Sequence, residues 1–329
     1  MRKKILEMLK NADGNFISGE GIAEKLNVSR TAIWKHIKKL REKGYEITSR
    51  ENRGYSLQEI PDILLPEIVQ DGLNTKIIGS SCEKIIYLES VDSTNNFAKK
   101  ISNEDAADGT VVIAEEQTGG KGRLERKFFS PKFKSILFSL ILRPNCLPKD
   151  APKFTLTAAV AIILAMKKFN LDAGIKWPND ILFENKKVVG ILTEMSAEIE
   201  RVNFIIIGVG INANISAEEF PDDIKKIAAS LSEMNGGKNI SRVKFFRAVL
   251  EEFDKLYAEI NSNGFKKIFD LWKKFNITLG QEIKIISAEG GEIFFGKAID
   301  IDKDGALIVK TSDGLKTFYA GDVSIRKIN

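Results

Sequence analysis

The stretch that decides the fold is Gln117-Thr-Gly-Gly-Lys-Gly-Arg-Leu-Glu-Arg-Lys-Phe128, which comes shortly after the apolar run Thr110-Val-Val-Ile-Ala114. The apolar run predicts a buried strand, and the glycines let the following backbone approach a phosphate closely. The loop also carries four cations, Lys121, Arg123, Arg126 and Lys127. A basic glycine loop behind a strand favours an anion-binding site. A mobile basic surface loop is the alternative that this stretch alone leaves open.

The residues present also exclude several kinds of site. No Gly-Lys-Ser/Thr ends the loop, so it is not a Walker loop, and Glu125 stands where a dinucleotide fingerprint has its third glycine. The chain has a single histidine, His36, which lies within the first 60 residues and before the loop. A Ser-His triad or a His-ligated zinc site is therefore excluded downstream.

The flanking sequence predicts a sheet with helices around it. Apolar runs predict strands at 84–88, 135–142, 181–183, 187–194 and 204–212, and short turns between the later ones indicate a largely antiparallel sheet. An apolar-faced helix is expected at 154–169. Polar Ser93, Thr94 and Asn95 precede another helix, where a plain helix cap is the alternative to a binding role.

The first 60 residues predict a separate DNA-binding module. Ser18 and Ser29 read as N-caps of two short helices separated by a tight turn, and the second helix spans Arg30 to Lys43. The segment from Tyr45 to Leu57 reads as a hairpin, which resembles the wing of a winged helix-turn-helix. The candidates for DNA contact are Ser29, Arg30, Thr31, Trp34, Lys35 and Lys38. A helical interaction module with a solvated lysine face is the alternative.

Charge and composition agree with this division. Residues 1–60 carry 13 Lys and Arg against 8 Asp and Glu, whereas the rest of the 329-residue chain is balanced. The basic excess therefore coincides with the expected nucleic-acid module. The longest apolar run, Ala158 to Met166, is shorter than the about 20 residues of a membrane helix. Together with two widely spaced cysteines, Cys82 and Cys146, this predicts a cytoplasmic protein with no membrane partner.

In the C-terminal part, the spacing of apolar residues changes from a helical pattern to a strand pattern. Residues 213–268 read mainly as helices, and five short strands are expected at 282–286, 292–295, 298–301, 306–310 and 316–319. These strands predict a small β-barrel resembling SH3. The expected domains are residues 1–62, 63–268 and 269–329.

Five motifs in order carry a resemblance to a known family. They are Asp92-Ser-Thr-Asn95, Gln117-Thr-Gly-Gly-Lys-Gly-Arg123, Lys176-Trp-Pro-Asn-Asp180, Lys187-Val-Val-Gly190 and Gly208-Val-Gly-Ile-Asn212. The set resembles bacterial biotin protein ligases, and with the N-terminal module the chain resembles the bifunctional members that also repress biotin synthesis genes. The resemblance implies an α+β chain with a winged helix-turn-helix, a central mixed sheet with helices like the class II aminoacyl-tRNA synthetase core, and the SH3-like barrel.

The resemblance also implies a reaction and its participants. Biotin and ATP, with Mg²⁺, would give biotinyl-5′-AMP, and biotin would pass to a lysine of a biotin carboxyl carrier protein. Biotinyl-AMP would act as corepressor, and a homodimer formed on adenylate binding would read operator DNA. A ligand-sensing regulator without transfer activity and a lipoate ligase-like enzyme remain as alternatives.

Roles carry over to the matching positions only. The implied catalytic residues are Lys187, Arg123 and Asp180, with Asp180 also a candidate for Mg²⁺ and a buried structural carboxylate as its alternative. The implied biotin-binding residues are Ser93, Thr94, Asn95, Gln117, Lys121, Gly122, Arg123, Lys187 and Gly190. The implied nucleotide-binding residues are Gly120, Lys121, Arg123, Arg126, Trp177, Asn179, Asn212 and Arg326. Lys121, Glu125 and Phe128 replace the family's arginine, glycine and tryptophan, and we expect the first two to weaken retention of the adenylate.

Overall fold

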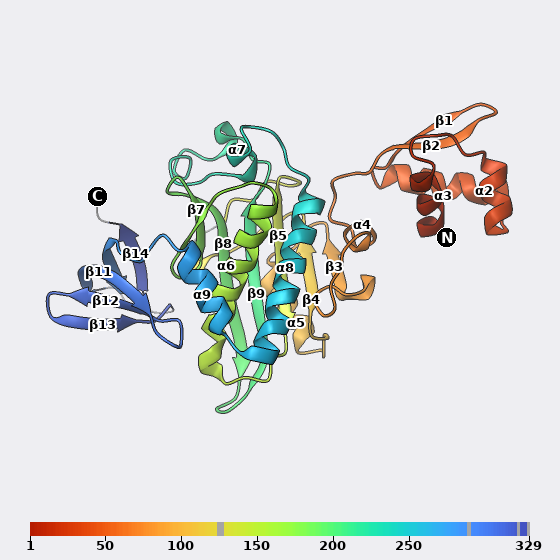
Figure 1. Ribbon diagram of the computed structural model, residues 1–329. Coiled ribbons are helices and arrows are strands. Elements are labelled where there is room, and N and C mark those ends of the chain that lie inside the picture. Colours follow the sequence, from red (N-terminus) through yellow and green to blue (C-terminus); the bar gives the residue numbers. More distant parts are fainter. Residues whose placement is uncertain (124–127, 288–290, 321–322, 328–329) are drawn as a thin grey trace. The chain divides into compact units, whose positions relative to one another are not determined.

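The computed structural model describes residues 1–123, 128–287, 291–320 and 323–327. The chain divides into two compact units, Met1–Ile63 and Leu64–Asn329. Each unit is described by itself, and Figure 1 labels the elements of both.

The first unit contains three helices and a hairpin: α1 (Arg2–Asn11), α2 (Gly19–Leu26), α3 (Arg30–Glu42), β1 (Glu46–Arg50) and β2 (Gly54–Glu59). The predicted caps are confirmed, since Ser18 Oγ accepts from the Gly21 amide at 2.9 Å and Ser29 Oγ from the Ala32 amide at 3.2 Å. Strands β1 and β2 pair antiparallel. The predicted helix-turn-helix with its hairpin is therefore present.

Helix α3 is amphipathic in the way its sequence predicts. Ile33, Ile37 and Leu40 are buried, because positions three and four apart lie on one helix face. The opposite face, with Thr31, Trp34, Lys35 and Lys38, is exposed. The apolar stripe fixes the helix in its unit and leaves the basic face free for a partner.

The second unit is built on a seven-stranded mixed sheet in the order β3-β4-β5-β9-β8-β7-β6. The strands are β3 (Ile85–Leu88), β4 (Thr110–Ala114), β5 (Ser135–Leu142), β6 (Gly174–Lys176), β7 (Asp180–Phe183), β8 (Lys186–Ala197) and β9 (Val202–Asn212). Only the β3–β4 pair is parallel, and the other neighbours in this sheet run antiparallel. The largely antiparallel prediction is confirmed.

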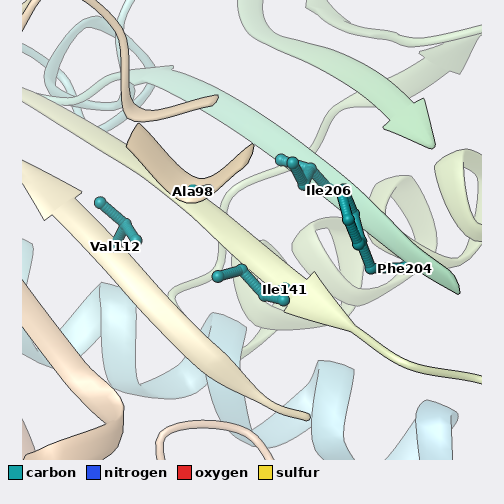
Figure 2. Close-up of a cluster of buried hydrophobic side chains, with 5 residues drawn as sticks. All are labelled: Ala98, Val112, Ile141, Phe204 and Ile206. Atoms are coloured by element: carbon teal, nitrogen blue, oxygen red, sulfur yellow. The ribbon is translucent and has the colours of Figure 1, made fainter. Parts of the chain in front are cut away.

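Helices cover the sheet. They are α4 (Pro66–Gln70), α5 (Thr94–Ser102), α6 (Ala151–Lys168), α7 (Leu231–Met234), α8 (Arg242–Asn263) and α9 (Lys266–Phe275). Figure 1 shows α6 and α8 lying across one face of the sheet. On α5, Ala98 packs against Val112, Ile141, Phe204 and Ile206 of three neighbouring strands (Figure 2).

Every residue of β4 and β5 is buried. A strand covered on both faces reads as a continuous apolar run, which explains the runs in the sequence. The polar residues within such strands therefore need partners inside the protein.

The C-terminal sheet differs from the prediction in three places. Helix α9 continues to Phe275, past the expected end of the helices at 268, because Ile268 and Trp272 lie one turn apart and are both buried. The strands expected at 292–295 and 298–301 are one strand, β11 (Ile293–Ile301), with an irregular register between Ala298 and Asp300. The strand β14 (Val323–Lys327) was not predicted.

The remaining strands are β10 (Glu282–Ser287), β12 (Leu307–Thr311) and β13 (Gly314–Phe318). All pairs in the order β13-β12-β11-β10-β14 are antiparallel. Closure of this sheet into an SH3-like barrel and the three domain boundaries stay predictions. In the described part of the chain, no helix combines the length and apolarity needed to cross a bilayer.

Candidate active site

A small cavity of about 60 Å³ opens where the glycine loop meets α5, β8 and β9. Its wall includes all nine residues implied to bind biotin, namely Ser93, Thr94, Asn95, Gln117, Lys121, Gly122, Arg123, Lys187 and Gly190. It also includes Phe128, Asn179, Ile191, Leu192, Gly208, Val209 and Gly210. Four of the five sequence motifs therefore contribute several residues to one hollow, and the fifth contributes Asn179.

The polar end of the cavity is formed by the start of α5. The Ser93 side chain makes no capping hydrogen bond to the helix, although Ser93 occupies the N-cap position. Gln117 Oε1 instead accepts from the Thr94 amide at 2.7 Å and lies 3.1 Å from Thr94 Oγ1. Because the Gln117 carbonyl is occupied in this way, its amino group remains as a donor at the cavity.

One lining residue, Lys187, belongs to an ion pair. Lys187 Nζ is 2.6 Å from Asp180 Oδ1, and these side chains are 36% and 25% exposed. The β7–β8 pairing places Asp180 opposite Gly190, which follows Lys187 by three residues on β8. A Cβ at Gly190 would lie 2.8 Å from Lys187 Nζ, so the end of the lysine side chain passes directly over this glycine.

Arg123 connects the glycine loop to the C-terminal sheet. Its Nη2 donates to Val323 O at 2.6 Å and to Ala320 O, and its Nη1 donates to Asn179 Oδ1 at 3.3 Å. A guanidinium has five donors in a fixed fork, so it can hold several acceptors at once. The C-terminal sheet therefore positions the arginine at the cavity.

The other end of the loop closes back on the sheet. The Phe128 amide donates to Gly120 O at 3.2 Å, and a Cβ at Gly210 would come within 2.7 Å of the Phe128 ring. Phe128 thus occupies the position over β9 that the family fills with tryptophan. Glu125 and Arg126 lie outside the described residues.

Four of the implied nucleotide contacts are not among the residues that line this cavity, namely Gly120, Trp177, Asn212 and Arg326. Trp177 is 1% exposed, and its Nε1 donates to Gly305 O at 3.0 Å, so it ties the sheet to the C-terminal strands. Arg326 is exposed and lines a different hollow, together with Lys176. Asn212 is buried and is described next.

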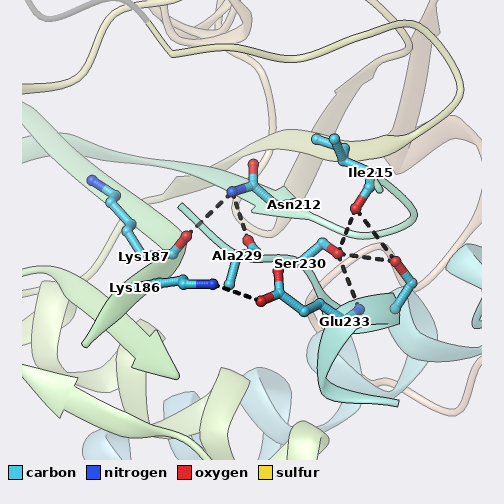
Figure 3. Close-up of polar contacts among 8 residues, drawn as sticks. Lys186, Lys187, Asn212, Ile215, Ala229, Ser230 and Glu233 are labelled. Carbon is cyan, nitrogen blue, oxygen red and sulfur yellow. Dashed lines mark hydrogen bonds and ion pairs between the residues drawn. The ribbon is translucent and has the colours of Figure 1, made fainter. Parts of the chain in front are cut away.

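Figure 3 shows the contacts around Asn212. Its Nδ2 donates to Ala229 O at 2.9 Å and to Lys187 O at 3.3 Å, so it holds the backbone of Lys187. On the same strand, Lys186 pairs with Glu233 at 2.9 Å and therefore does not compete for Asp180. Asn212 is placed to orient Lys187 through its backbone.

A buried ion pair anchors the strand that leads into the loop. Glu115 is fully buried, and its Oε2 accepts from Arg242 Nη1 at 2.6 Å. Arg242 also donates to Ser135 O at 2.9 Å, and Glu115 Oε1 accepts from the Leu64 amide at 3.4 Å. The pair joins α8, two strands and the first residue of the second unit, two positions before Gln117.

Two polar residues near the cavity did not figure among the sequence candidates. Ser139 Oγ lies 2.8 Å from Thr94 Oγ1 and 2.7 Å from Asn95 Oδ1, and it is fully buried. Glu194 Oε2 accepts from Asn95 Nδ2 at 2.6 Å. Ser139 interrupts the apolar run 135–142, and a polar residue inside a fully buried strand is a signal that could have identified it.

The candidate DNA contacts lie in the first unit. Arg30, Thr31, Lys35 and Lys38 are exposed on α3, and Trp34 is half exposed with Lys38 Nζ 5.8 Å from its ring. Ser29 uses its side chain as the N-cap of that helix. Exposed cations along one helix face suit contact with phosphates.

Three family models match the chain. They are an HTH domain over residues 2–56, the Biotin/lipoate A/B protein ligase family over residues 87–212, and the Biotin protein ligase C terminal domain over residues 278–326. Each match falls on one of the three regions that the sequence distinguishes.

Relatives match over nearly the whole length. The bifunctional ligase/repressor BirA of Bacillus spizizenii is 40% identical over 326 residues, which cover 99% of this chain and 98% of the relative. BirA of Escherichia coli K12 is 30% identical, covering 98% and 96%. The solved biotin protein ligase from Aquifex aeolicus in complex with biotin and ATP has a TM-score of 0.64 at 29% identity, covering 74% of this chain and 99% of that chain. The chain belongs to the biotin protein ligase family, among its bifunctional ligase/repressors.

Proposed function

We propose that the protein joins biotin to ATP as biotinyl-5′-AMP, transfers biotin to a lysine of a biotin carboxyl carrier protein, and represses biotin synthesis and transport genes with the adenylate as corepressor. The observation that carries the enzymatic part is the cavity itself. It combines a polar end at Thr94 and Gln117 with two cations, Lys187 and Arg123, and the loop backbone. A carboxylate and a polyanion can meet only where such positive charge offsets their repulsion.

In the first step, a biotin carboxylate oxygen attacks the α-phosphorus of ATP, and pyrophosphate leaves. No protein nucleophile is required, because positioning and charge stabilisation lower the barrier. Lys187 would lie between the carboxylate and the α-phosphate, and Arg123 would stabilise charge that develops on the phosphoryl oxygens. The neighbouring residues Lys121 and Gly122 would close over the product.

In the second step, the neutral amine of the acceptor lysine attacks the carbonyl carbon of the adenylate. AMP leaves, and the amine loses a proton. Asp180 would accept that proton, and its pair with Lys187 supports this role because Lys187 lines the cavity. Asn179 would contact the nucleotide from the position at which it holds Arg123.

Magnesium is expected to enter with ATP. Mg²⁺ commonly binds substrate phosphates and waters with one or two carboxylates, rather than an all-protein cage. Among residues that the structure describes, no cluster of three or more His, Cys, Asp or Glu could hold a metal. Asp180 lies next to the cavity through its pair with Lys187, so it would supply one carboxylate to an ATP-bound ion.

The experiment for the enzymatic part uses the full chain with α-labelled ATP. Adding biotin should give a labelled adenylate and pyrophosphate, and a biotin carboxyl carrier domain should then consume the adenylate and gain biotin. Lipoate serves as the matched control. An adenylate formed only with lipoate would favour the lipoate ligase alternative, and binding of biotin without any adenylate would favour a regulator that senses ligand.

The regulatory part requires two copies of α3 on a symmetric operator. We expect biotinyl-AMP to promote a homodimer, because dimers of helix-turn-helix proteins read half-sites one helical turn apart. Sedimentation of the full chain with and without the adenylate tests this point. A sedimentation coefficient that the adenylate leaves unchanged would contradict adenylate-driven dimerisation.

A further inference from the structure

The turn at residues 302–306, which joins β11 to β12, contacts the central part of the second unit, and we call it the docking turn. Gly305 O accepts from the Nε1 of the buried Trp177 indole at 3.0 Å. Lys153 of α6 places its Nζ 3.1 Å from Asp304 Oδ1. The docking turn is therefore held by an indole N–H on one side and by an ammonium group on the other.

Lys153 is a cation with little access to water. Its side chain is 10% exposed, and besides Asp304 it pairs with Asp150 at 2.7 Å. The ring of Phe265 lies 5.4 Å from its Nζ. A charge that has lost most of its water depends on partners inside the protein, so the contact with Asp304 is stronger than an ion pair on the surface.

The docking turn has a fixed backbone. The Asp302 amide donates to Ala306 O at 2.9 Å, and the Gly305 amide donates to Asp302 O at 3.1 Å. Asp302 Oδ1 also accepts from the amides of Asp304 and Ala306. Gly305 has a φ of +83°, which favours glycine, and a Cβ there would lie 3.0 Å from Leu156 of α6. The turn can therefore pass the position of its contacts on to the strands that it joins.

Strand register links the docking turn to the carbonyls that hold Arg123. Leu307, the first residue after the turn, pairs with Phe318 on β13. Ala320 follows Phe318 by two residues, and its carbonyl accepts from Arg123 Nη2, as does Val323 O at 2.6 Å. The docking turn and the Ala320 carbonyl therefore belong to the same end of the β12–β13 pair.

The segment that carries Trp177 also reaches Arg123 directly. Asn179, two residues after Trp177, accepts from Arg123 Nη1 at 3.3 Å. Asn179 is itself fixed, because its Nδ2 donates to Ile191 O at 2.7 Å. The guanidinium thus has acceptors on the central sheet and on the C-terminal sheet, and its rigid fork fits both only while the two sheets keep their spacing.

We propose that Trp177 and Lys153 are positioning residues, which hold the docking turn so that the C-terminal carbonyls orient Arg123 toward the α-phosphate. This inference rests on the proposed function, in which Arg123 stabilises charge on the phosphoryl oxygens. Neither Trp177 nor Lys153 lines the cavity. Their effect on the reaction therefore passes through Arg123, which differs from the direct nucleotide contact that the family resemblance implies for Trp177.

The test is a double-mutant cycle in the full chain. Trp177→Phe removes the indole N–H and keeps an aromatic ring, and Arg123→Met removes the guanidinium. The cycle is measured as kcat/KM for ATP in biotin-dependent exchange of labelled pyrophosphate. It is also measured as the dissociation constant of biotinol-5′-AMP, a stable analogue that keeps the phosphate and can be titrated into slow variants.

We expect Trp177→Phe to weaken both quantities about five- to tenfold, the effect of one hydrogen bond, when Arg123 is present. In the Arg123→Met background the same substitution should change them by less than about twofold, because residues that act as a unit are not additive. Equal factors in the two backgrounds would overturn the proposal, since a direct nucleotide contact or a general loss of structure does not depend on Arg123. No effect of Trp177→Phe would overturn it as well.

Lys153→Met tests the same link from α6. The two carboxylates that it leaves behind are 19% and 27% exposed and can be hydrated. We expect a loss of about fivefold in kcat/KM for ATP, which again disappears with Arg123→Met. Lys273→Met is the matched control, because it removes a lysine–aspartate pair with Asp300 of β11 in which both side chains are more than 40% exposed. The control should stay within about twofold, and an equal loss in the control would contradict a specific role of the docking turn.

Urea unfolding shows whether each variant is folded under the assay conditions. Asp304→Asn replaces any variant that is not folded, since it weakens only the contact between the docking turn and Lys153. Failure of the proposed function has a different signature, because the unchanged chain would then form no biotin-dependent adenylate. Failure of this inference leaves that activity intact and makes the effects of the substitutions additive.

Discussion

Replacing Lys187 by methionine should slow formation of the adenylate about 10²- to 10³-fold, which is the loss found when one preorganised donor is removed from a site of developing charge. This corresponds to about 3 to 4 kcal/mol of transition-state stabilisation. Methionine keeps most of the side-chain volume, and the backbone at this position is held independently by Asn212. The effect should therefore appear in the rate and not in the folding of the chain.

The assay is biotin-dependent exchange of labelled pyrophosphate into ATP, followed by single-turnover formation of the adenylate. Lys186→Met is the matched control, because the neighbouring lysine on the same strand pairs with Glu233 and not with Asp180. We expect the control to remain within about threefold of the unchanged chain, because Lys186 contacts Glu233 and does not line the cavity. A loss below about tenfold in Lys187→Met, or an equal loss in the control, would refute the reasoning.

The partner of the lysine extends the same prediction. The pair is about one-third exposed, so its coupling free energy should lie between that of surface and buried pairs, about 1 to 2 kcal/mol in a double-mutant cycle. Asp180→Asn should slow transfer to the carrier lysine more than it slows adenylate formation if Asp180 accepts the amine proton. Equal effects on the two steps would assign Asp180 a purely orienting role.

Three further outcomes are expected. Arg242→Met should lower the free energy of unfolding of the second unit, measured in urea, by about 3 to 5 kcal/mol, because it leaves the buried Glu115 carboxylate unpaired. Adding Glu115→Gln should recover much of that free energy. A decrease below about 1 kcal/mol in Arg242→Met would contradict the prediction. Burial raises the pKa of the Cys146 thiol to about 11, so at pH 8 iodoacetamide should label exposed Cys82 first. Peptide mass spectrometry should show the difference in labelling rate between the two cysteines shrinking only as the pH approaches 11. Equal labelling of both cysteines in the native protein at pH 8 would contradict this prediction. If Lys35 contacts a phosphate, Lys35→Ala should weaken operator binding and reduce the slope of the logarithm of the binding constant against the logarithm of the salt concentration by about 0.9. Fluorescence anisotropy measures both, and an unchanged slope would exclude that contact.

Much of the fold could be predicted from local patterns. The predicted helix caps and the predicted buried face of α3 are confirmed, because capping and helical periodicity depend on residues a few positions apart. The caps are Ser18 and Ser29, and the buried face consists of Ile33, Ile37 and Leu40. The single strand β11 was predicted as two, since a local irregularity does not interrupt pairing with its neighbours. The missed strand β14 forms at the edge of its sheet by pairing with β10, a partner about forty residues earlier in the chain.

In the candidate site, too, local patterns predicted the residue types, whereas the contacts of each residue depend on distant segments. The motifs identified which residues carry cations, glycines and amides, and the cavity contains most of them. The nucleotide role of Trp177 stays a prediction. An aromatic in a motif gives no sign of which way it faces, and its indole donates to Gly305 O. Arg326 was assigned to the nucleotide, and the structure places it in a different hollow.

The basic glycine loop, the family and the two activities were determined by the sequence alone, because they depend on residue types at fixed spacings. Only the tertiary structure decided what each group faces. The pairing of β7 with β8 brings Asp180 to Lys187, the C-terminal carbonyls hold Arg123, and the helix α5 lies where Asn95 can reach Glu194. These contacts join residues about 7 to 200 positions apart, and no local pattern encodes them because they arise from packing and from the pairing of buried polar groups.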